Sequence, residues 1–518
     1  MNYFKERNLL SNHLSMKYVL SVLFFVAANA GFSQSSSLGI FSNHTDIGNP
    51  KIAGTVKYDD DNGEYLVTGS GQNIWGTHDD FQYLWNKLKG NFLLDARLNF
   101  KGKGKNPHRK IGWMVRQSLE PNSAYADAAV HGEGLTSLQF RKAANGETEE
   151  IKTEVTAPDF IRLERNGNTI IFYAAKYGES LKEVARKDLD LGDEVYVGLF
   201  LTSHEELVSE QAVFSNVRIS IPAKPEFVPY RDYSSSNIEI LDISSSNRKI
   251  IFSSKEDVEA PNWMKDGSAL IYNSKGLLYK LPLRSLQITA INTDFAKKNN
   301  NDHVLSFDGK YLGISNESTK EKANTESMIY VVPVNGGIPQ QVTMVGPSYL
   351  HGWSPDRKTL VYCAQRDGKF DVYAIPVTGG TEKKLTDAEG LDDGPEYSPD
   401  GKYIYFNSTR TGTMQIWRMK PDGSEQEQVT NDEFNNWFAH ISPDGKKMVF
   451  VSFGKDVAPT DHPYYKHVTI RMMQLNGSDK PRVLAYLYGG QGTMNVPSWS
   501  PDGKKIAFVS YTFPDDYY

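Results

Sequence analysis

A short phrase of turn and strand residues recurs six times between Asp266 and Asp502. Its clearest copies, at 398–402, 442–446 and 500–504, all read Ser-Pro-Asp-Gly-Lys. The repeated aspartates stand at 266, 308, 356, 400, 444 and 502, which gives intervals of 42, 48, 44, 44 and 58 residues. Periods in the low forties are typical of the four-stranded blades of a β-propeller. The C-terminal half is therefore predicted to be a propeller.

The two ends of the repeat region predict how the ring closes. The sixth copy keeps only its inner strands, around Trp499 and at 506–509. Two strand-like segments, at 238–241 and 249–252, precede the first copy and can supply the outer strands. A ring closed by strands from both ends hides the edges that an open sheet exposes. We therefore expect six blades.

The repeat resembles that of TolB-type propellers across residues 236–518. This resemblance implies an interaction protein of the periplasm, although the N-terminal part of the chain differs from that of TolB. The propeller also resembles, more weakly, oligogalacturonate lyase. That family uses a histidine-based metal site on the propeller axis to β-eliminate uronates, and the matching positions here are His303, His351 and His440.

The N-terminal half carries the pattern of antiparallel strands. Residues 92, 94, 96, 98 and 100 are apolar while 95, 97 and 99 are polar, which is the period-two pattern of a half-buried strand. Asn166-Gly167 separates two further strand-like runs and favours a tight hairpin turn. Many short strands without helical periodicity predict a β-sandwich. The phrases at 74–83, 112–116 and 212–219 resemble concanavalin/laminin-G-like jelly rolls of secreted carbohydrate-associated proteins.

Four segments are expected along the chain. Residues 1–30 combine basic residues, the apolar run 19–26 and Ala28-Asn29-Ala30, and predict a secretory signal peptide. The sandwich is placed at 38–222, a Pro-rich linker at 223–235 and the propeller at 236–518. The protein is thus predicted to be periplasmic or secreted, with no transmembrane segment in the mature chain.

The composition of the chain argues against several classes of function. The net charge of -6 comes from interspersed acidic and basic residues, so the sequence offers no basic stripe for nucleic acid. The single cysteine, Cys363, excludes an intrachain disulfide, and no cysteine follows the leader to accept a lipid anchor. No Gly-x-Ser-x-Gly motif is present, which argues against a serine hydrolase. The expected partner is a glycan or a protein.

Polar residues just before each repeated turn are candidates for the mouth of the central channel. Three histidines among them, His303, His351 and His440, form a candidate site for Mn²⁺, Ca²⁺ or Zn²⁺, since imidazole is an ordinary ligand for divalent cations. The alternative is a hydrated polar channel without a metal. Candidate ligand-binding residues of the same region are Glu259, Asp393 and Asn495.

The long interval between Asp444 and Asp502 is a second candidate region, because a loop longer than its connection requires is often functional. His462 or Lys466 is a candidate catalytic base, and Arg471 could hold an acidic sugar. Gln491 belongs to the Gly-rich part of the same interval. The alternative is a loop that only covers one face of the propeller.

The sandwich offers a candidate sugar platform, because aromatic faces stack on pyranose rings while guanidinium and imidazole groups hydrogen-bond hydroxyls. The alternative is that the tryptophans belong to the core and that the polar groups are paired. The platform candidates are Trp75, His78, Trp113, Arg116 and His131.

Three functions remain open from the sequence. The first is a non-catalytic exported binding protein that recognises a glycan or an envelope partner through the propeller channel face and the sandwich. The second is a metal-assisted carbohydrate-active enzyme of the lyase type, acting at the propeller axis. The third is a TolB-like envelope scaffold.

Overall fold

Every regular element is a β-strand in the residues that the computed structural model describes, 37–228, 232, 234–317 and 326–514. These residues belong to one unit, Ser37–Tyr518. The predicted signal peptide at 1–30 lies outside them, as do residues 229–231 and 233 of the predicted linker. Within the described ranges, no helix is long and apolar enough to cross a membrane.

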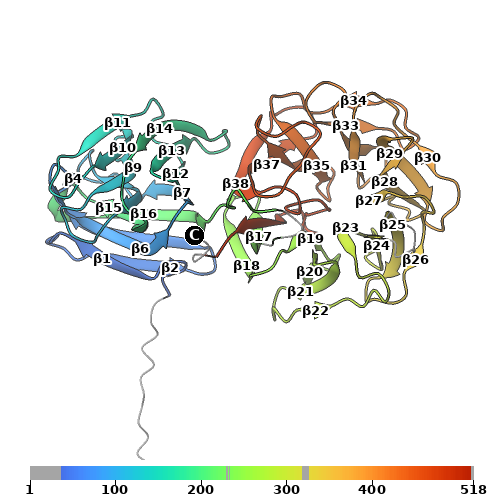
Figure 1. Ribbon diagram of the computed structural model, residues 1–518, viewed down its shortest axis with the longest axis horizontal. Coiled ribbons are helices and arrows are strands. Elements are labelled where there is room, and N and C mark those ends of the chain that lie inside the picture. The colour runs from blue at the N-terminus through green and yellow to red at the C-terminus, as the bar shows by residue number, and fades with distance from the viewer. Residues whose placement is uncertain (1–36, 229–231, 233, 318–325, 515–518) are drawn as a thin grey trace, which may run out of the picture. The chain divides into compact units, whose positions relative to one another are not determined.

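The N-terminal strands form two antiparallel seven-stranded sheets, labelled in Figure 1. The first sheet contains, in spatial order, β1 (Asn43–Ile47), β6 (Phe81–Lys89), β15 (Glu194–Thr202), β8 (Lys110–Arg116), β9 (Tyr125–His131), β10 (Thr136–Arg141) and β11 (Glu149–Lys152). The second contains β14 (Lys182–Asp188), β13 (Thr169–Ala175), β12 (Phe160–Asn166), β7 (Phe92–Phe100), β16 (Glu205–Ser220), β3 (Glu64–Gly71) and β2 (Thr55–Asp59). A small hairpin joins β4 (Ile74–Trp75) to β5 (His78–Asp79).

The core of the sandwich lies between these sheets. Phe92, Leu94 and Ala96 of β7 are buried in the same cluster as Leu84 and Trp113 of the opposite sheet. Side chains of alternate residues point to one face of a strand, so the period-two pattern of 92–100 supplies this inner surface. The predicted sandwich is confirmed, while its assignment to the concanavalin-like jelly rolls stays a prediction.

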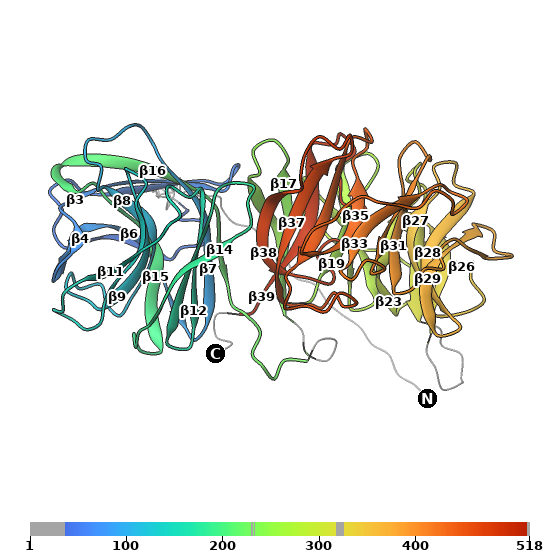
Figure 2. The same cartoon turned by 90° about the horizontal axis from the view of Figure 1, so that it is seen from above.

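Six small sheets follow and surround a common centre in Figure 1; Figure 2 shows the same ring from its edge. The first complete sheet consists of β19 (Glu259–Trp263), β20 (Ala269–Ser274), β21 (Leu277–Pro282) and β22 (Thr289–Ala290). The second consists of β23 (Asn299–Leu305), β24 (Tyr311–Glu317), β25 (Ser327–Pro333) and β26 (Gln340–Gln341). The third consists of β27 (Ser348–Trp353), β28 (Thr359–Arg366), β29 (Lys369–Pro376) and β30 (Lys383–Lys384). The next two are β31 (Asp392–Tyr397), β32 (Ile404–Ser408), β33 (Gln415–Met419) and β34 (Glu427–Gln428); and β35 (Asn435–Ile441), β36 (Lys447–Phe453), β37 (Lys466–Gln474) and β38 (Arg482–Gly489).

The sixth sheet closes the ring with strands from both ends of the repeat region. β17 (Ser235–Asp242) pairs with β18 (Arg248–Ser254) on one side and with β39 (Lys505–Thr512) on the other. Trp499 adds an isolated bridge to Ile506 at the inner position. The predicted six-bladed propeller and its mode of closure are confirmed. The segment boundaries at 38–222, 223–235 and 236–518 stay predictions.

The repeated phrase forms the same turn in each of its clear copies. In the copy at 398–402, the Asp400 carboxylate accepts hydrogen bonds from the Ser398 hydroxyl at 2.8 Å and from the Lys402 amide at 3.1 Å. Gly401 has a φ of 70°, a conformation that glycine adopts without steric cost. These contacts are local, so the turn that follows each innermost strand is specified by residues that are close in sequence.

Candidate functional site

The innermost strands of the propeller border a cavity of about 900 Å³. Its lining combines carboxylates, side-chain amides, imidazoles and aromatic rings from five blades. The lining residues used below are Asp257, Glu259, Asn301, Asp302, His351, Asp393, Phe438, His462, Tyr464, Gln491 and Asn495.

Irregular strand pairing turns polar side chains into this cavity. The β19–β20 register shifts between Glu259 and Asn262, and the β31–β32 register shifts between Asp393 and Glu396. The residues that follow the two acids, Ala260 and Gly394, have φ values of 52° and 59°. A bulge of this kind bends the strand and re-aims a side chain. Equivalent bulges in these two blades, which the β23 and β27 blades separate, therefore bring Glu259 and Asp393 to one cavity.

His351 and Asp393 form the central charged pair of the cavity. His351 Nε2 lies 3.3 Å from Asp393 Oδ1, and the imidazole stacks on Phe438 with ring centroids 6.0 Å apart. Burial lowers the pKa of His351, but the charges of Asp302 and Asp393 outweigh burial and raise it overall. Burial raises the pKa of Asp393, but the hydrogen bond from His351, the charges of His351 and His462 and the Gly394 amide together outweigh burial and lower it. The protonated imidazole is thus favoured here.

A second acidic group lies at the β19 side of the cavity. The Tyr464 hydroxyl donates a hydrogen bond to Glu259 Oε1. Burial, and secondly the charge of Asp257, raise the pKa of Glu259 to about 8. Burial also raises the pKa of Asp302 to about 6, and Asn300 donates a 2.8 Å hydrogen bond to its carboxylate. Protonated carboxyls can donate hydrogen bonds as well as accept them.

The structure brings six of the sequence candidates to this cavity: Glu259, His351, Asp393, His462, Gln491 and Asn495. His462 packs edge-on against Trp437 and Phe438, with ring centroids 4.4 and 5.3 Å apart. The Gln491 side-chain oxygen accepts a 2.9 Å hydrogen bond from Asn495 Nδ2. Their roles in binding or catalysis stay predictions.

Two other propeller candidates lie elsewhere. Arg471 is buried and pairs with Asp432 at 2.8 Å, with its guanidinium 4.9 Å from the centre of the Phe434 ring. It joins β37 to the segment between β34 and β35 instead of reaching the cavity. Lys466 begins β37 and does not line the cavity, so it is no neighbour of His462 there.

The three histidines expected to hold a metal on the axis do not converge. His303 is fully buried with Nε2 3.3 Å from the Ile271 carbonyl oxygen. His440 lies between Glu396 at 2.6 Å and the Met494 carbonyl oxygen at 2.9 Å. Only His351 lines the cavity. These residues do not fit a shared Mn²⁺, Ca²⁺ or Zn²⁺ site, because two of them use their rings to join neighbouring blades.

The sandwich candidates also separate. Trp113 is fully buried in the core, and Arg116 is fully buried with Nη2 3.3 Å from Asp79 Oδ2. Neither offers a surface to a sugar, which corrects the predicted platform. Trp75 is 43% exposed and His131 is 5% exposed. Lys110 Nζ lies 5.4 Å from the centre of the Trp75 ring.

Several cavity residues escaped the sequence reasoning. Asp302, Asn301 and Phe438 line the cavity. The sequence does not show this, because only the three-dimensional structure of a blade determines where these side chains point. One signal was available for two of them: the run Asn299-Asn300-Asn301-Asp302 concentrates four polar residues just before a degenerate copy of the repeat. Such a run is unusual at the start of a buried strand.

Comparison with known proteins agrees with the fold. Residues 323–463 match the TolB beta propeller domain family. The uncharacterized protein Atu1656 of Agrobacterium fabrum (strain C58) is 47% identical over 280 residues, which cover 54% of this chain and 93% of that protein. A solved structure of a candidate TolB from Agrobacterium tumefaciens is 46% identical, with a TM-score of 0.51, over 55% of this chain and 99% of that chain.

An oligogalacturonate lyase solved in complex with manganese is similar at a lower level, with 14% identity and a TM-score of 0.37 over 54% of this chain and 83% of that chain. The alignment with Atu1656 spans nearly all of that protein at high identity. By this relationship and by its six repeat-built blades, the chain belongs to the TolB-like β-propeller family.

Proposed function

We propose that this protein is an exported binding protein that recognises a hydroxyl-rich glycan in the propeller cavity. The observation that carries the proposal is the composition of the cavity wall, where amides and carboxyls lie beside an aromatic ring. Sugar hydroxyls both donate and accept hydrogen bonds, as side-chain amides do. Aromatic faces pack on the apolar face of a pyranose, and the partly exposed rings of Tyr349 and Phe370 line this cavity.

The charge of the cavity supports a neutral glycan over a polyanion. Glu259, Asp302 and Asp393 line the interior, and His351 is paired with Asp393 there. Lys275 and Lys298 line the same cavity and are paired with Glu256 at 2.8 Å and Glu317 at 3.8 Å. An acidic sugar would meet acidic side chains in the interior of the cavity, because the three lining lysines, Lys275, Lys297 and Lys298, are all exposed.

A glycan array followed by calorimetric titration of the full chain tests the proposal. Asn301→Ala removes a cavity amide, and we expect about 3- to 10-fold weaker binding, the effect of one lost hydrogen bond. Asn476→Ala is the matched control, because Asn476 is an exposed turn residue outside the cavity. Equal affinities of the two variants would place binding elsewhere, and the absence of any glycan ligand would favour an envelope scaffold.

The exposed Trp75 of the sandwich is a separate candidate contact for the same glycan. The Trp75→Ala variant tests whether the glycan contacts the sandwich as well as the propeller. If the sandwich contributes, affinity falls for long oligosaccharides and is unchanged for short ones. An unchanged affinity for both would confine recognition to the propeller.

One observation favours a second candidate function, a carbohydrate-active enzyme of the lyase type. The His351–Asp393 pair is an imidazole held by a carboxylate; its protonated form can act as a general acid, and its neutral form, present above its raised pKa, can act as a general base. Incubation with uronate oligosaccharides tests it, since β-elimination creates an unsaturated product that absorbs ultraviolet light. The enzyme reading requires product formation that His351→Gln abolishes, and it fails if the wild-type chain forms no product.

A further inference from the structure

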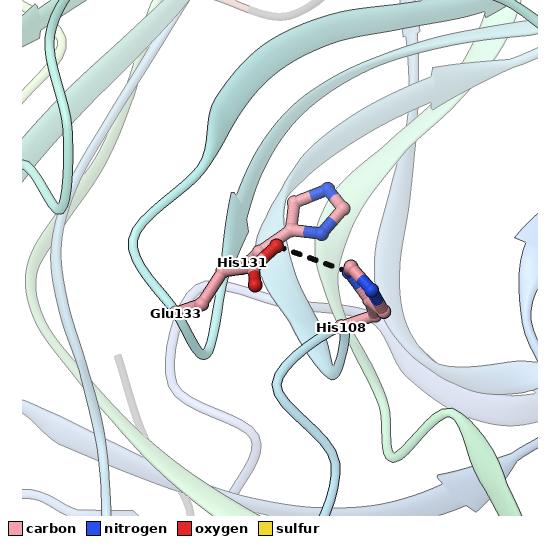
Figure 3. Close-up of side chains that lie close together, drawn as sticks. All are labelled: His108, His131 and Glu133. Atoms are coloured by element: carbon pink, nitrogen blue, oxygen red, sulfur yellow. Dashed lines mark ion pairs between the residues drawn. The ribbon is translucent and has the colours of Figure 1, made fainter.

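Three neighbouring strands of the first sandwich sheet end at a group of histidines. Lys110 of β8 pairs with His131, the last residue of β9, and with Thr202, the last residue of β15. His108 precedes β8, and His204 follows β15 by two residues. Antiparallel pairing therefore brings residues from three distant parts of the chain together where these three strands begin or end. Figure 3 shows three of the side chains, His108, His131 and Glu133.

Backbone hydrogen bonds fix the loops that carry these side chains. The Gly132 amide donates to the Arg109 carbonyl at 2.8 Å, and the Glu133 amide donates to the Pro107 carbonyl at 2.9 Å. The loop before β8 and the turn after β9 are thus joined on both sides of His108. Ligands held on such a braced frame lose little conformational freedom when they bind an ion.

The ligating atoms of His108, His131 and Glu133 all lie within 4.8 Å of one another. His108 Nδ1 is 3.1 Å from Glu133 Oε1, as the dashed line in Figure 3 shows. Metal–ligand bonds of about 2.0–2.1 Å in a tetrahedral site separate neighbouring ligand atoms by about 3.3 Å. The pair is already near that spacing, so small side-chain rotations would complete the set. Among the described residues, no other histidine, cysteine or acidic cluster meets this distance.

Two unpartnered imidazole nitrogens point to a missing ligand. His131 is 5% exposed; its Nε2 lies 3.3 Å from Gln139, and its buried Nδ1 has no hydrogen-bond partner. His204 Nδ1 is also buried and without a partner, and its ring centroid lies 5.6 Å from that of His108. A buried polar atom without a partner is costly, and a bound ion would supply the partner.

We propose that this cluster is a binding site for a divalent transition metal of the Zn²⁺ class, with His108, His131 and Glu133 as ligands and His204 as a fourth. Two or three imidazoles with one carboxylate are ligands that suit Zn²⁺, whereas Ca²⁺ and Mg²⁺ prefer oxygen ligands. The site is independent of the propeller cavity and of the glycan proposal.

Two neighbouring residues, Gln139 and Lys110, affect how the site can bind a metal ion. With His131 bound through Nδ1, its proton resides on Nε2, which faces the Gln139 amide nitrogen at 3.3 Å. Metal binding therefore requires the Gln139 amide to turn over and to give up its hydrogen bonds with Lys110 and Glu150. Lys110 Nζ, which lies 3.0 Å from the Gln139 oxygen and 2.9 Å from the Ile74 carbonyl, opposes a cation electrostatically. The Glu133 carboxylate offsets this charge from within the ligand set.

Metal-stripped full-length protein titrated with Zn²⁺ tests the proposal, with calorimetry for affinity and mass spectrometry for metal content. We expect one equivalent of Zn²⁺, and a loss of affinity of at least about 10-fold in His108→Ala and Glu133→Gln. Both side chains are well exposed, at 52% and 40%, so their replacement should leave the fold intact. Substitution by Co²⁺ should give the visible absorption of a tetrahedral site.

Two control variants identify the site. His78→Ala removes an exposed sandwich histidine, and His351→Ala removes the propeller histidine; neither should change Zn²⁺ affinity. Undiminished Zn²⁺ binding in His108→Ala and Glu133→Gln would overturn the proposal. Loss of the metal in His351→Ala alone would also overturn it, and would support a metal at the propeller axis.

Discussion

At the scale of single residues, burial decides which polar groups hold the fold and which are free for a ligand. Asp79 is fully buried between two arginines, Arg116 at 3.3 Å and Arg141 at 2.8 Å. Asp393 is also largely buried, yet it faces a cavity. The sequence shows an Asp in both places, and only the three-dimensional surroundings distinguish a structural ion pair from a candidate site.

The Asp79 cluster gives a stability prediction. Asp79→Asn leaves two buried guanidinium groups without their counter-charge, so we expect a loss of about 3–5 kcal/mol in the free energy of unfolding. Chemical denaturation measures it, and Asp80→Asn on the partly exposed neighbouring residue is the control. A loss below about 1 kcal/mol would contradict the structural role assigned to the cluster.

Glu259 gives a pH prediction. Its folded-state pKa is raised from 4.5 to about 8, so between these values the folded chain keeps a proton that the unfolded chain has released. Stability therefore falls as pH rises through this window. Glu259→Gln mimics the protonated form, and it should gain at least about 2 °C in melting temperature over the wild type at pH 9.

Near pH 5 the carboxyl is protonated in the folded chain, so the gain should vanish. Asp257 and Asp302 lie near Glu259 in both proteins, so the difference between the two melting curves reports chiefly on Glu259. A gain that is the same at both pH values would show that the pKa of Glu259 is not raised.

At the scale of elements, the repeated turn explains why the propeller was readable from sequence. Its hydrogen bonds join residues at most five positions apart, as from the Tyr403 amide to the Ser398 hydroxyl at 3.0 Å. Long-range packing is not needed to specify such a turn. The period-two run at 92–100 predicted β7 for the same reason, since alternation is a local property of a strand.

Gly445 tests the turn directly. Its φ is 71°, and a Cβ added there would meet no atom within 4 Å, so Gly445→Ala probes backbone strain alone. We expect a loss of about 1 kcal/mol, with a smaller loss for Gly445→Asn because asparagine tolerates this conformation. Lys446→Ala should change stability little. Equal stabilities of the Ala variant and the wild type would show that the turn does not require a left-handed residue.

The inner strands show where sequence reasoning stopped. His303 and His351 both stand five residues before a repeated aspartate, yet His351 lines the cavity and His303 bonds to the Ile271 carbonyl. The bulge of β27 falls at His351, between Leu350 and Gly352, whereas the irregular stretch of β23 runs from Asn299 to His303 and leaves Asp302 at the cavity. A shift of one residue in a bulge redirects every side chain, and the repeat phrase does not encode it.

At the scale of the whole molecule, closure of the ring creates the candidate site. β17 and β39 come from opposite ends of the repeat region and pair over eight residues, from Ser235↔Thr512 to Asp242↔Lys505. The cavity residues come from several separate blades. The sequence could predict the ring because the period is regular, but it could not predict which groups meet at its centre.

The central claim is that a glycan binds at this centre. Hydrogen–deuterium exchange of the full chain, with and without the best ligand from the glycan array, tests it most directly. The account predicts slower exchange in β19, β23, β27 and β31, which carry Glu259, Asn301, His351 and Asp393. Slower exchange confined to the sandwich strands, with those four propeller strands unchanged, would contradict it.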